Sequence, residues 1–454
     1  MIRYLLNQYV KFFRKNGDER SLRIRKNIFY SFIIKGASVF ISFLMVPLMI
    51  HYLNPVQYGI WITIYSLVAW INTFDIGLSN SLRNKLARLI ALHKQEDALK
   101  YISTTYLLLL LIAAGIFLSV FIFSIFINWN HFLNLGNAIN YSITPVILIT
   151  TGLFCFQFIL QPVNSILTAL QEPFWVALIL FTGQLVTIIA IFLLQYFTQG
   201  SLLFIVFITV GSPLLVLFIV SVYLYYTRLK SFAPRFTFSD LHVSKELLSS
   251  GFAFFFIQMG ALVLYETDNI IITKTLGPSA VTVFNICYKY FSIIIIISTI
   301  VMTPYWSAFT DAYAKKDFDW ITQSVRKMKR FWLALSAGCL LLFFIAPFIY
   351  EFWIGQTIKV PVALSFCMFL NVILLNWVTI HSFILNGIGK LKLQSILLVF
   401  ASAVNIPLSF YLVHKTGITG TVWANIIVLL FIIIFLMRQC KLVLQQKAAG
   451  IWNS

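Results

Sequence analysis

Long apolar runs separated by short polar stretches divide this sequence, and that pattern limits the folds open to it. Each run holds roughly 20 or more residues, enough for a helix to cross a hydrocarbon core of about 30 Å. The sequence therefore predicts an all-α membrane protein with about 12 transmembrane helices. The runs lie near 28–50, 58–80, 102–127, 142–166, 174–197, 202–226, 250–275, 281–306, 331–353, 361–385, 393–413 and 418–437.

Composition excludes a water-soluble globule. Hydrophobic residues make up 60% of the chain and charged residues 10%, whereas a soluble domain carries about 25% charged residues. The cysteines lie in or at the end of apolar runs without CxxC spacing, which predicts buried free thiols. The histidines also lack ligand spacing, so no metal site and no cofactor is predicted. The cysteines are Cys155, Cys287, Cys339, Cys367 and Cys440.

Basic residues give the orientation in the membrane. If the N-terminus is cytoplasmic, nearly all lysines and arginines fall on the cytoplasmic side, where positive residues are enriched in membrane proteins. The exceptions are Lys35, Lys274, Lys289, Lys359 and Lys415. Both termini are therefore predicted to be cytoplasmic. The net charge of +19 is interpreted as flanks that face anionic lipid, and nucleic-acid binding is not predicted.

Two halves of the chain resemble each other in hydropathy and turns. Leu53-Asn54-Pro55 follows the first run and Leu276-Gly277-Pro278 follows the seventh. Six runs on each side of a basic linker predict two lobes related as a parallel repeat, with a central cleft between them. The predicted divisions are a basic amphipathic segment 1–27, a six-helix lobe 28–227, a linker 228–248, a second six-helix lobe 249–438 and a cytoplasmic tail 439–454.

Charged residues inside the predicted spans need partners or water, because a charge at the bilayer centre costs about 3 kcal/mol on insertion scales. Counting from the outer turns places Lys35 and Asp75 at similar depth. The same counting brings Glu266, Asp268 and Lys289 together near mid-membrane. Two interpretations stay open at this point. The charges neutralise each other inside a lobe, or they line the cleft as substrate contacts and as carriers of ions or protons.

Polar stripes run along several predicted spans. Gln157, Gln161 and Asn164 follow spacings of four and three, so they share one helix face, which cannot point at acyl chains. Hydrogen bonding between helices is the alternative explanation. The number of amides and hydroxyls favours a hydrated cleft. Its other predicted polar residues are Ser38, Gln258, Asn269 and Asn376.

The sequence lacks Walker A, HExxH and GxSxG motifs. These absences favour a transporter over an enzyme. Transport would then draw on an ion gradient, the membrane potential or the gradient of the substrate.

Short strings in both halves of the chain carry a family resemblance. Residues 70–87 read WINTFDIGLSNSLRNKLA, after YGIW at 58–61, and the second half has LGP followed by VFNICYKYF. These strings resemble the O-antigen and polysaccharide repeat-unit flippases of bacteria. Those flippases belong to the multidrug, oligosaccharidyl-lipid and polysaccharide exporter superfamily.

The resemblance implies a V-shaped fold of two helix bundles in the bacterial cytoplasmic (inner) membrane. It implies movement of a polyprenyl-diphosphate-linked oligosaccharide to the outer leaflet, for the synthesis of O-antigen, capsule or exopolysaccharide. It also implies a polymerase and a chain-length regulator as partners. The cationic cavity of the family would be matched here by Lys35, Arg83, Lys274 and Lys289.

Two rival functions remain. A multidrug cation antiporter of the same superfamily would use a carboxylate near the start of the first span, where this chain has Lys35. Glu266 and Asp268 keep that rival open. A membrane glycan polymerase would carry a large outer loop, and the longest predicted one here is only residues 128–141. Flippases for peptidoglycan or teichuronic-type precursors are alternatives within the family.

Overall fold

A computed structural model describes residues 19–69, 78–92, 94–135, 139, 141–170, 172–238, 240, 243–248, 266–314 and 316–453. All regular elements within these ranges are helices. Ten of the helices are long and apolar enough to cross a membrane, and they match ten of the predicted spans. The runs 58–80 and 250–275 extend outside the described residues. The all-helical, multi-pass class is confirmed, while the total of twelve spans and the side of the termini stay predictions.

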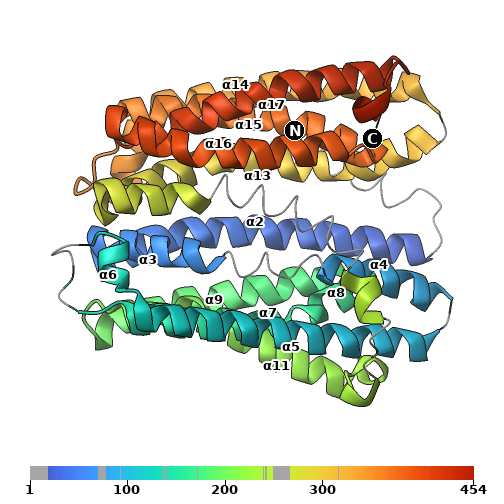
Figure 1. Cartoon of the computed structure of the whole chain (residues 1–454), viewed down its shortest axis with the longest axis horizontal. Coiled ribbons are helices and arrows are strands. Elements are labelled where there is room, and N and C mark those ends of the chain that lie inside the picture. Colours follow the sequence, from blue (N-terminus) through green and yellow to red (C-terminus); the bar gives the residue numbers. More distant parts are fainter. Residues whose placement is uncertain are drawn as a thin grey trace. The chain divides into compact units, whose positions relative to one another are not determined.

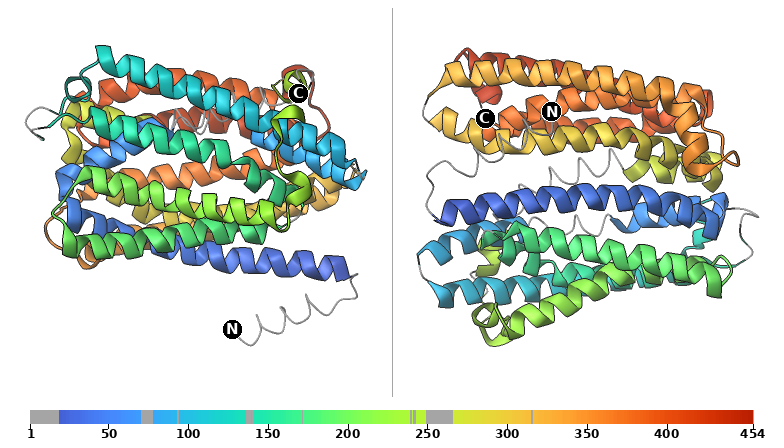
Figure 2. Two further views of the ribbon diagram at one scale, coloured as in Figure 1. Left: turned by 90° about the horizontal axis from the view of Figure 1, so that it is seen from below. Right: turned by 180° about the vertical axis from the view of Figure 1, so that it is seen from behind.

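The chain forms two compact units, each with long helices running side by side (Figures 1 and 2). The first unit consists of Met1–Tyr52, Ile71–Phe126 and Thr144–Phe255, and the second of Leu53–Trp70, Ile127–Ile143 and Phe256–Ser454. Two segments from the first half of the sequence thus make their contacts in the second unit. The lobe boundaries expected from topology stay a prediction.

The described part of the first unit holds ten helical elements and the helical residues 243–248, and one predicted run is unexpectedly divided between two of these elements. The run near 142–166 is divided at Gln161, because Pro162 has no N–H for the preceding turn and suits the first position of a new helix. The elements are α2 (Glu19–Leu53), α4 (Leu78–Ala91), α5 (Gln95–Phe126), α7 (Thr144–Leu160), α8 (Pro162–Ala169), α9 (Pro173–Phe197), α10 (Leu202–Thr209), α11 (Gly211–Tyr226), η3 (Lys230–Phe232) and η4 (Phe236–Phe238).

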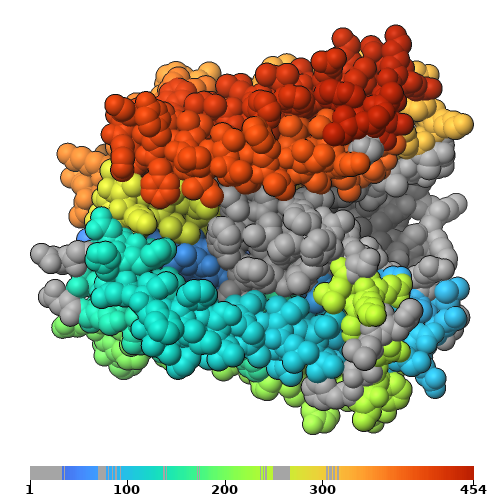
Figure 3. Space-filling view, in the orientation of Figure 1, coloured from blue at the N-terminus to red at the C-terminus, as the bar shows by residue number. Residues whose placement is uncertain are grey.

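The core of the first unit joins α4, α5, α8, α11 and η3. Leu82, Ile102 and Ile166 are fully buried in it. Other residues of α5 lie at the surface, where this helix forms a continuous band (Figure 3). Leu111, Phe123 and Phe126 of this helix are well exposed. A large apolar surface of this kind fits a helix whose solvent is lipid.

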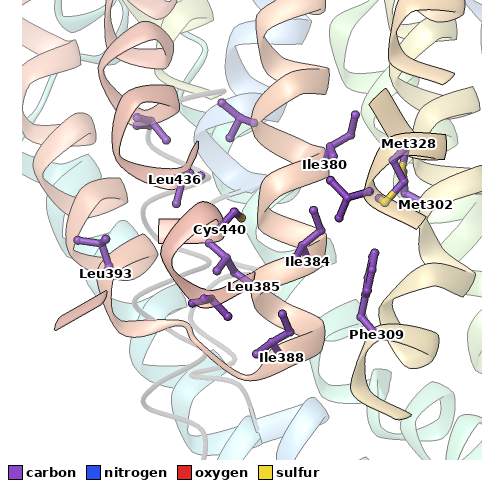
Figure 4. Packing of buried hydrophobic residues seen from close by; sticks show 14 of the residues in the cluster. Met302, Phe309, Met328, Ile380, Ile384, Leu385, Ile388, Leu393, Leu436 and Cys440 are labelled. Atoms are coloured by element: carbon purple, nitrogen blue, oxygen red, sulfur yellow. The ribbon is translucent and has the colours of Figure 1, made fainter. Parts of the chain in front are cut away.

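The described part of the second unit contains five long helices and several shorter elements. These are α3 (Pro55–Ala69), α6 (Trp129–Phe132), the helical residues 266–276, α13 (Pro278–Ala314), α14 (Phe318–Ile354), α15 (Val362–Ile388), α16 (Lys392–Thr416), α17 (Thr419–Leu444) and η5 (Gly450–Asn453). Their apolar cluster is dense. Met302 and Phe309 of α13 pack beside Met328 of α14, and Leu436 of α17 lies near Leu385 of α15 (Figure 4). Since lipid is as apolar as leucine, close packing rather than escape from solvent stabilises such a cluster.

Small residues allow two close helix approaches in this unit. A Cβ atom added at Gly420 of α17 would overlap the backbone of Leu412 and Val413 in α16. One added at Gly59 of α3 would overlap the backbone carbonyl of Pro278 at the start of α13. Glycine is the usual means of bringing helix backbones together in a membrane. It therefore fixes α16 against α17, and α3 against α13.

All five cysteines are free and buried. The prediction of buried thiols without disulfides is confirmed.

Candidate functional site

Most predicted site residues of the first unit lie on α2, α4 and α7–α8. Lys35 and Ser38 belong to α2; Ser38 is half-buried, and the side chain of Lys35 lies outside the described set. Arg83 is exposed on α4. Among the described residues no hydrogen bond or ion pair holds its guanidinium, which leaves its donors available to an anion. Asp75 and Gln258 are not among the described residues.

The polar stripe of the fourth span follows the break between α7 and α8. Asn164 donates from Nδ2 to Oε1 of Gln161 over 3.2 Å. The Oδ1 atom of Asn164 is buried and has no hydrogen-bond partner within the described part of the chain. Gln157 is half-buried one turn earlier. Two side chains of the stripe therefore hydrogen-bond to each other, and Oδ1 of Asn164 stays available as an acceptor among the described residues.

Three further predicted site residues lie in the second unit. Lys274 is exposed, with Nζ 5.1 Å from the ring centroid of Phe132, a cation–π geometry. Lys289 is half-buried on α13. Asn376 is buried and donates to the carbonyl of Val372 in its own helix over 2.8 Å. That bond within the helix explains how a polar side chain is accommodated at this buried position.

A buried polar network surrounds Asp268. Its Oδ2 atom accepts a hydrogen bond of 2.7 Å from Nδ2 of Asn425 on α17. Oδ1 of Asn425 accepts one of 2.8 Å from Nδ2 of Asn405 on α16. Oδ1 of Asn405 is in turn 3.4 Å from the hydroxyl of Ser409. The network thus joins residues 266–276 to both of the last two helices.

The other side of residues 266–276 forms a polar contact with α3, here called the α3 seam. Asn269 donates from Nδ2 to the hydroxyl of Ser66 over 2.9 Å. One turn further on, the hydroxyls of Thr273 and Thr63 hydrogen-bond to each other. Tyr58 of α3 donates to Oδ1 of Asn285 over 3.0 Å, and Thr282 donates to the carbonyl of Pro55 over 2.5 Å. Residues 266–276 and α13 therefore both bind α3 by polar groups.

Glu266 is half-buried at the start of this segment and lies within side-chain hydrogen-bonding reach of Ser66. Glu266 and Asp268 thus contact Ser66 and Asn425, and their expected meeting with Lys289 stays a prediction. Sequence reasoning did not single out Asn405, Ser409 or Asn425. A signal was present, since polar residues four apart occur in both of the last two apolar runs.

The basic linker docks on α5 in the first unit. Glu246 accepts hydrogen bonds from Lys85 of α4 and Tyr101 of α5. The backbone N–H of Arg235 donates to Ser103 over 3.0 Å, and that of Asp240 to Thr104 over 3.1 Å. The buried hydroxyls of α5 thereby satisfy backbone groups that a loop would otherwise leave to water.

Comparisons with solved structures define the class of protein. An inward-facing multidrug resistance MATE family transporter of the MOP superfamily matches with a TM-score of 0.74 and 14% identity, over 92% of this chain and all of the other. An outward-facing transporter of that description matches with a TM-score of 0.63 and 14% identity, over 96% of this chain and 98% of the other. The chain is a multi-pass membrane protein with the MATE fold.

The family is equally clear. Residues 24–310 match the family described as polysaccharide biosynthesis protein, and the chain belongs to that family. It is also 24% identical over 369 residues to a putative O-antigen export protein of Yersinia pseudotuberculosis, covering 78% of this chain and 81% of the relative. The resemblance read from residues 58–87 is thus confirmed.

Proposed function

We propose that this membrane transporter is a flippase in the bacterial cytoplasmic membrane. It moves a polyprenyl-diphosphate-linked oligosaccharide repeat unit from the inner to the outer leaflet, where a polymerase and a chain-length regulator use it. The observation that carries this proposal is the family match over residues 24–310. The similarity to a putative O-antigen export protein supports the same class of substrate.

The chemistry of the substrate fits the charged residues. A diphosphate needs cations, and Lys35, Arg83, Lys274 and Lys289 supply them in this proposal. Arginine and lysine bind phosphate by charge-assisted hydrogen bonds, and the guanidinium of Arg83 can do so with two parallel bonds. The amides of Gln157 and Gln161 provide donors and acceptors for sugar hydroxyls. The polyprenyl tail stays among the lipids.

Alternating access requires contacts that break at modest cost, and the α3 seam has them. Hydrogen bonds between membrane helices contribute about 0.6 kcal/mol each on average. The bonds of Ser66, Thr63 and Tyr58 therefore sum to a few kcal/mol at most. A difference of that size between two conformations leaves both accessible. In the proposed cycle the α3 seam forms in one state of the transporter and opens in the other.

A leaflet assay tests the proposal. The purified chain is placed in liposomes that contain a polyprenyl-diphosphate-linked oligosaccharide with a fluorescent label. Exposure of the sugar is followed with a glycosidase that cannot cross the membrane. We expect full cleavage with the protein and about half in protein-free liposomes, and slower movement of an analogue whose lipid carries a single phosphate. Equal cleavage with and without the protein would overturn the proposal.

A multidrug cation antiporter is the second candidate. The MATE fold and the buried carboxylate of Asp268 favour it, because a carboxylate can hold a drug cation. Deletion of the gene would decide between the two. Loss of surface polysaccharide supports the flippase, whereas normal polysaccharide together with increased drug sensitivity supports the antiporter.

A further inference from the structure

The exposed face of α14 changes from basic to apolar along the helix. Arg326 and Arg330 are exposed on it, and from Leu333 onward the next exposed positions of the same face are apolar. Spacings of three and four keep these positions on one side of a helix. They are Arg326, Arg330, Leu333, Ala337, Leu341, Phe344 and Phe348. The other side of α14 packs into the core of the second unit through Val325 and Met328.

The length of α14 places its arginines at the level of lipid headgroups. A helix of 37 residues is about 55 Å long at 1.5 Å per residue, whereas the hydrocarbon core is about 30 Å thick. Residues 331–350 carry no charge, and about 20 residues cross such a core. Arg326 and Arg330 therefore lie just beyond its edge. This is the end of α14 that the distribution of basic residues predicts to be cytoplasmic.

Lys329 adds a third cation on the side of α14 that meets α15. Its Nζ atom lies 5.8 Å from the ring centroid of Trp377 on α15. The ring of Trp377 packs against that of Trp332 on α14, with 4.5 Å between the centroids. Nε1 of Trp332 donates to the carbonyl of Ile373 over 3.0 Å. This aromatic pair holds Lys329 in place, and an ammonium over a ring keeps N–H donors on its other side.

Arg326, Lys329 and Arg330 have no carboxylate partner in the described part of the chain. The acid that precedes them most closely on α14 is Asp319, about two turns before Arg326. Like charges this close repel each other unless an anion lies among them. The ion pairs among the described residues join Lys85 to Glu246, Lys100 to Asp97 and Arg228 to Glu172.

We propose that Arg326, Lys329 and Arg330 bind the phosphate of an anionic phospholipid of the surrounding bilayer, such as phosphatidylglycerol. Its acyl chains lie along the apolar face of α14 that begins at Leu333. A guanidinium can bind a phosphate by two parallel hydrogen bonds, and basic pockets between cytoplasmic helix ends take anionic headgroups. Phosphatidylethanolamine binds less tightly, because its ammonium group adds a positive charge beside three others.

The lipid at this site is a neighbour of the transporter and not its cargo. The exposed face next to the three cations is apolar from Leu333 to Phe348. Such a face suits acyl chains and offers no hydroxyl or amide partner to sugars. A lipid that binds only the folded protein stabilises it, so the site links the second unit to the anionic lipid content of the membrane.

Binding is measured on the purified full-length chain in detergent. Lipid is titrated, and its binding is counted by native mass spectrometry. No lipid-linked oligosaccharide is present, so the result does not depend on what the protein transports. We expect phosphatidylglycerol to bind at least about tenfold more tightly than phosphatidylethanolamine with the same acyl chains. Equal affinity for the two lipids would overturn the proposal.

Variants separate the site from net charge. Arg326→Gln together with Arg330→Gln should weaken the binding of phosphatidylglycerol at least about tenfold, because both charge-assisted contacts are lost. Lysine at both positions should restore part of the affinity. The matched control is Lys392→Gln together with Lys447→Gln, which removes two charges from exposed positions of the same unit. Its affinity should equal that of the wild type, and an equal loss in both double variants would contradict the site.

A photoreactive phosphatidylglycerol then locates the bound lipid. Its label should attach to fragments of residues 318–354 and 362–388, and unlabelled phosphatidylglycerol should remove it. Label confined to other helices would overturn the assignment. An excess of polyprenyl-diphosphate-linked oligosaccharide should leave the label in place. Displacement by that compound would assign the three cations to the transported lipid and overturn the proposal of a bilayer lipid.

Discussion

Asn269 donates a hydrogen bond of 2.9 Å to the hydroxyl of Ser66 on α3. Its chain neighbour Asp268 accepts one of 2.7 Å from Asn425 on α17. Consecutive residues of a helix with 3.6 residues per turn point about 100° apart, so one turn contacts α3 on one side and α17 on another. A change in the network of Asp268 therefore reaches the α3 seam through a single turn of helix.

The bond between Asn269 and Ser66 gives the first prediction. In a double-mutant cycle of Ser66→Ala and Asn269→Ala, the coupling energy should be about 0.6 kcal/mol, the average for hydrogen bonds between membrane helices. It is measured from the unfolding of the purified protein in denaturant. The control pairs Ser66→Ala with Asn376→Ala, because the hydrogen bond that Asn376 donates among the described residues stays within its own helix. Additive effects in the first cycle would show that the bond contributes nothing.

Gly59 gives the second prediction. A Cβ at this position overlaps the carbonyl of Pro278, and backbone atoms cannot move aside as a flexible side chain can. Gly59→Ala should therefore destabilise the protein by about 1–3 kcal/mol, the usual cost of overpacking. Gly115→Ala is the matched control, since nothing lies within 4 Å of a Cβ there. Unfolding temperature and folded yield in detergent are compared. Equal values for the two variants would contradict the close approach of α3 and α13.

The membrane class and ten spans were predictable from the sequence, because lipid forces backbone polar groups to pair within helices and long apolar runs then become helices. The partner of Asp268 was not predictable by counting from the outer turn. Counting predicts a similar depth in the membrane for Asp268 and Lys289, but it does not give the direction in which a side chain points. The contact with Asn425 depends on how α17 packs. Pro162 could have predicted the helix break at Gln161, but the residues around the break form one continuous apolar run.

Docking of the linker gives the third prediction. Glu246 holds both Lys85 and Tyr101, so Glu246→Gln removes the ion pair and weakens the bond to Tyr101. Trypsin should then cut after Arg235 or Lys245 several-fold faster than in the wild type, because local opening exposes the chain. Cleavage is followed by mass spectrometry of the fragments. Glu351→Gln, at an exposed position in the second unit, should leave the rate unchanged, and unaltered cleavage of Glu246→Gln would contradict the docking.

The fourth prediction concerns the proposed phosphate contacts. Removing one charge-assisted hydrogen-bond partner costs about 1.5–3 kcal/mol, which corresponds to about a tenfold or larger loss of affinity. Arg83→Ala should therefore raise the KM for the lipid-linked oligosaccharide at least about tenfold. Arg83→Lys should lie between Arg83→Ala and the wild type, because lysine keeps the charge but not the paired donors. Lys35→Ala and Lys289→Ala should act in the same direction, and all variants should still insert in the membrane.

Lys85→Ala is the control that separates position from charge. It removes the same charge from the same helix, but residues two apart do not share a helix face, and Lys85 already bonds to Glu246. Its KM should match that of the wild type even though the linker opens more easily. Initial rates in the leaflet assay over a range of substrate concentrations measure these values. If Lys85→Ala and Arg83→Ala raise KM equally, the basic surface of α4 acts through its net charge, and Arg83 makes no specific contact with the diphosphate.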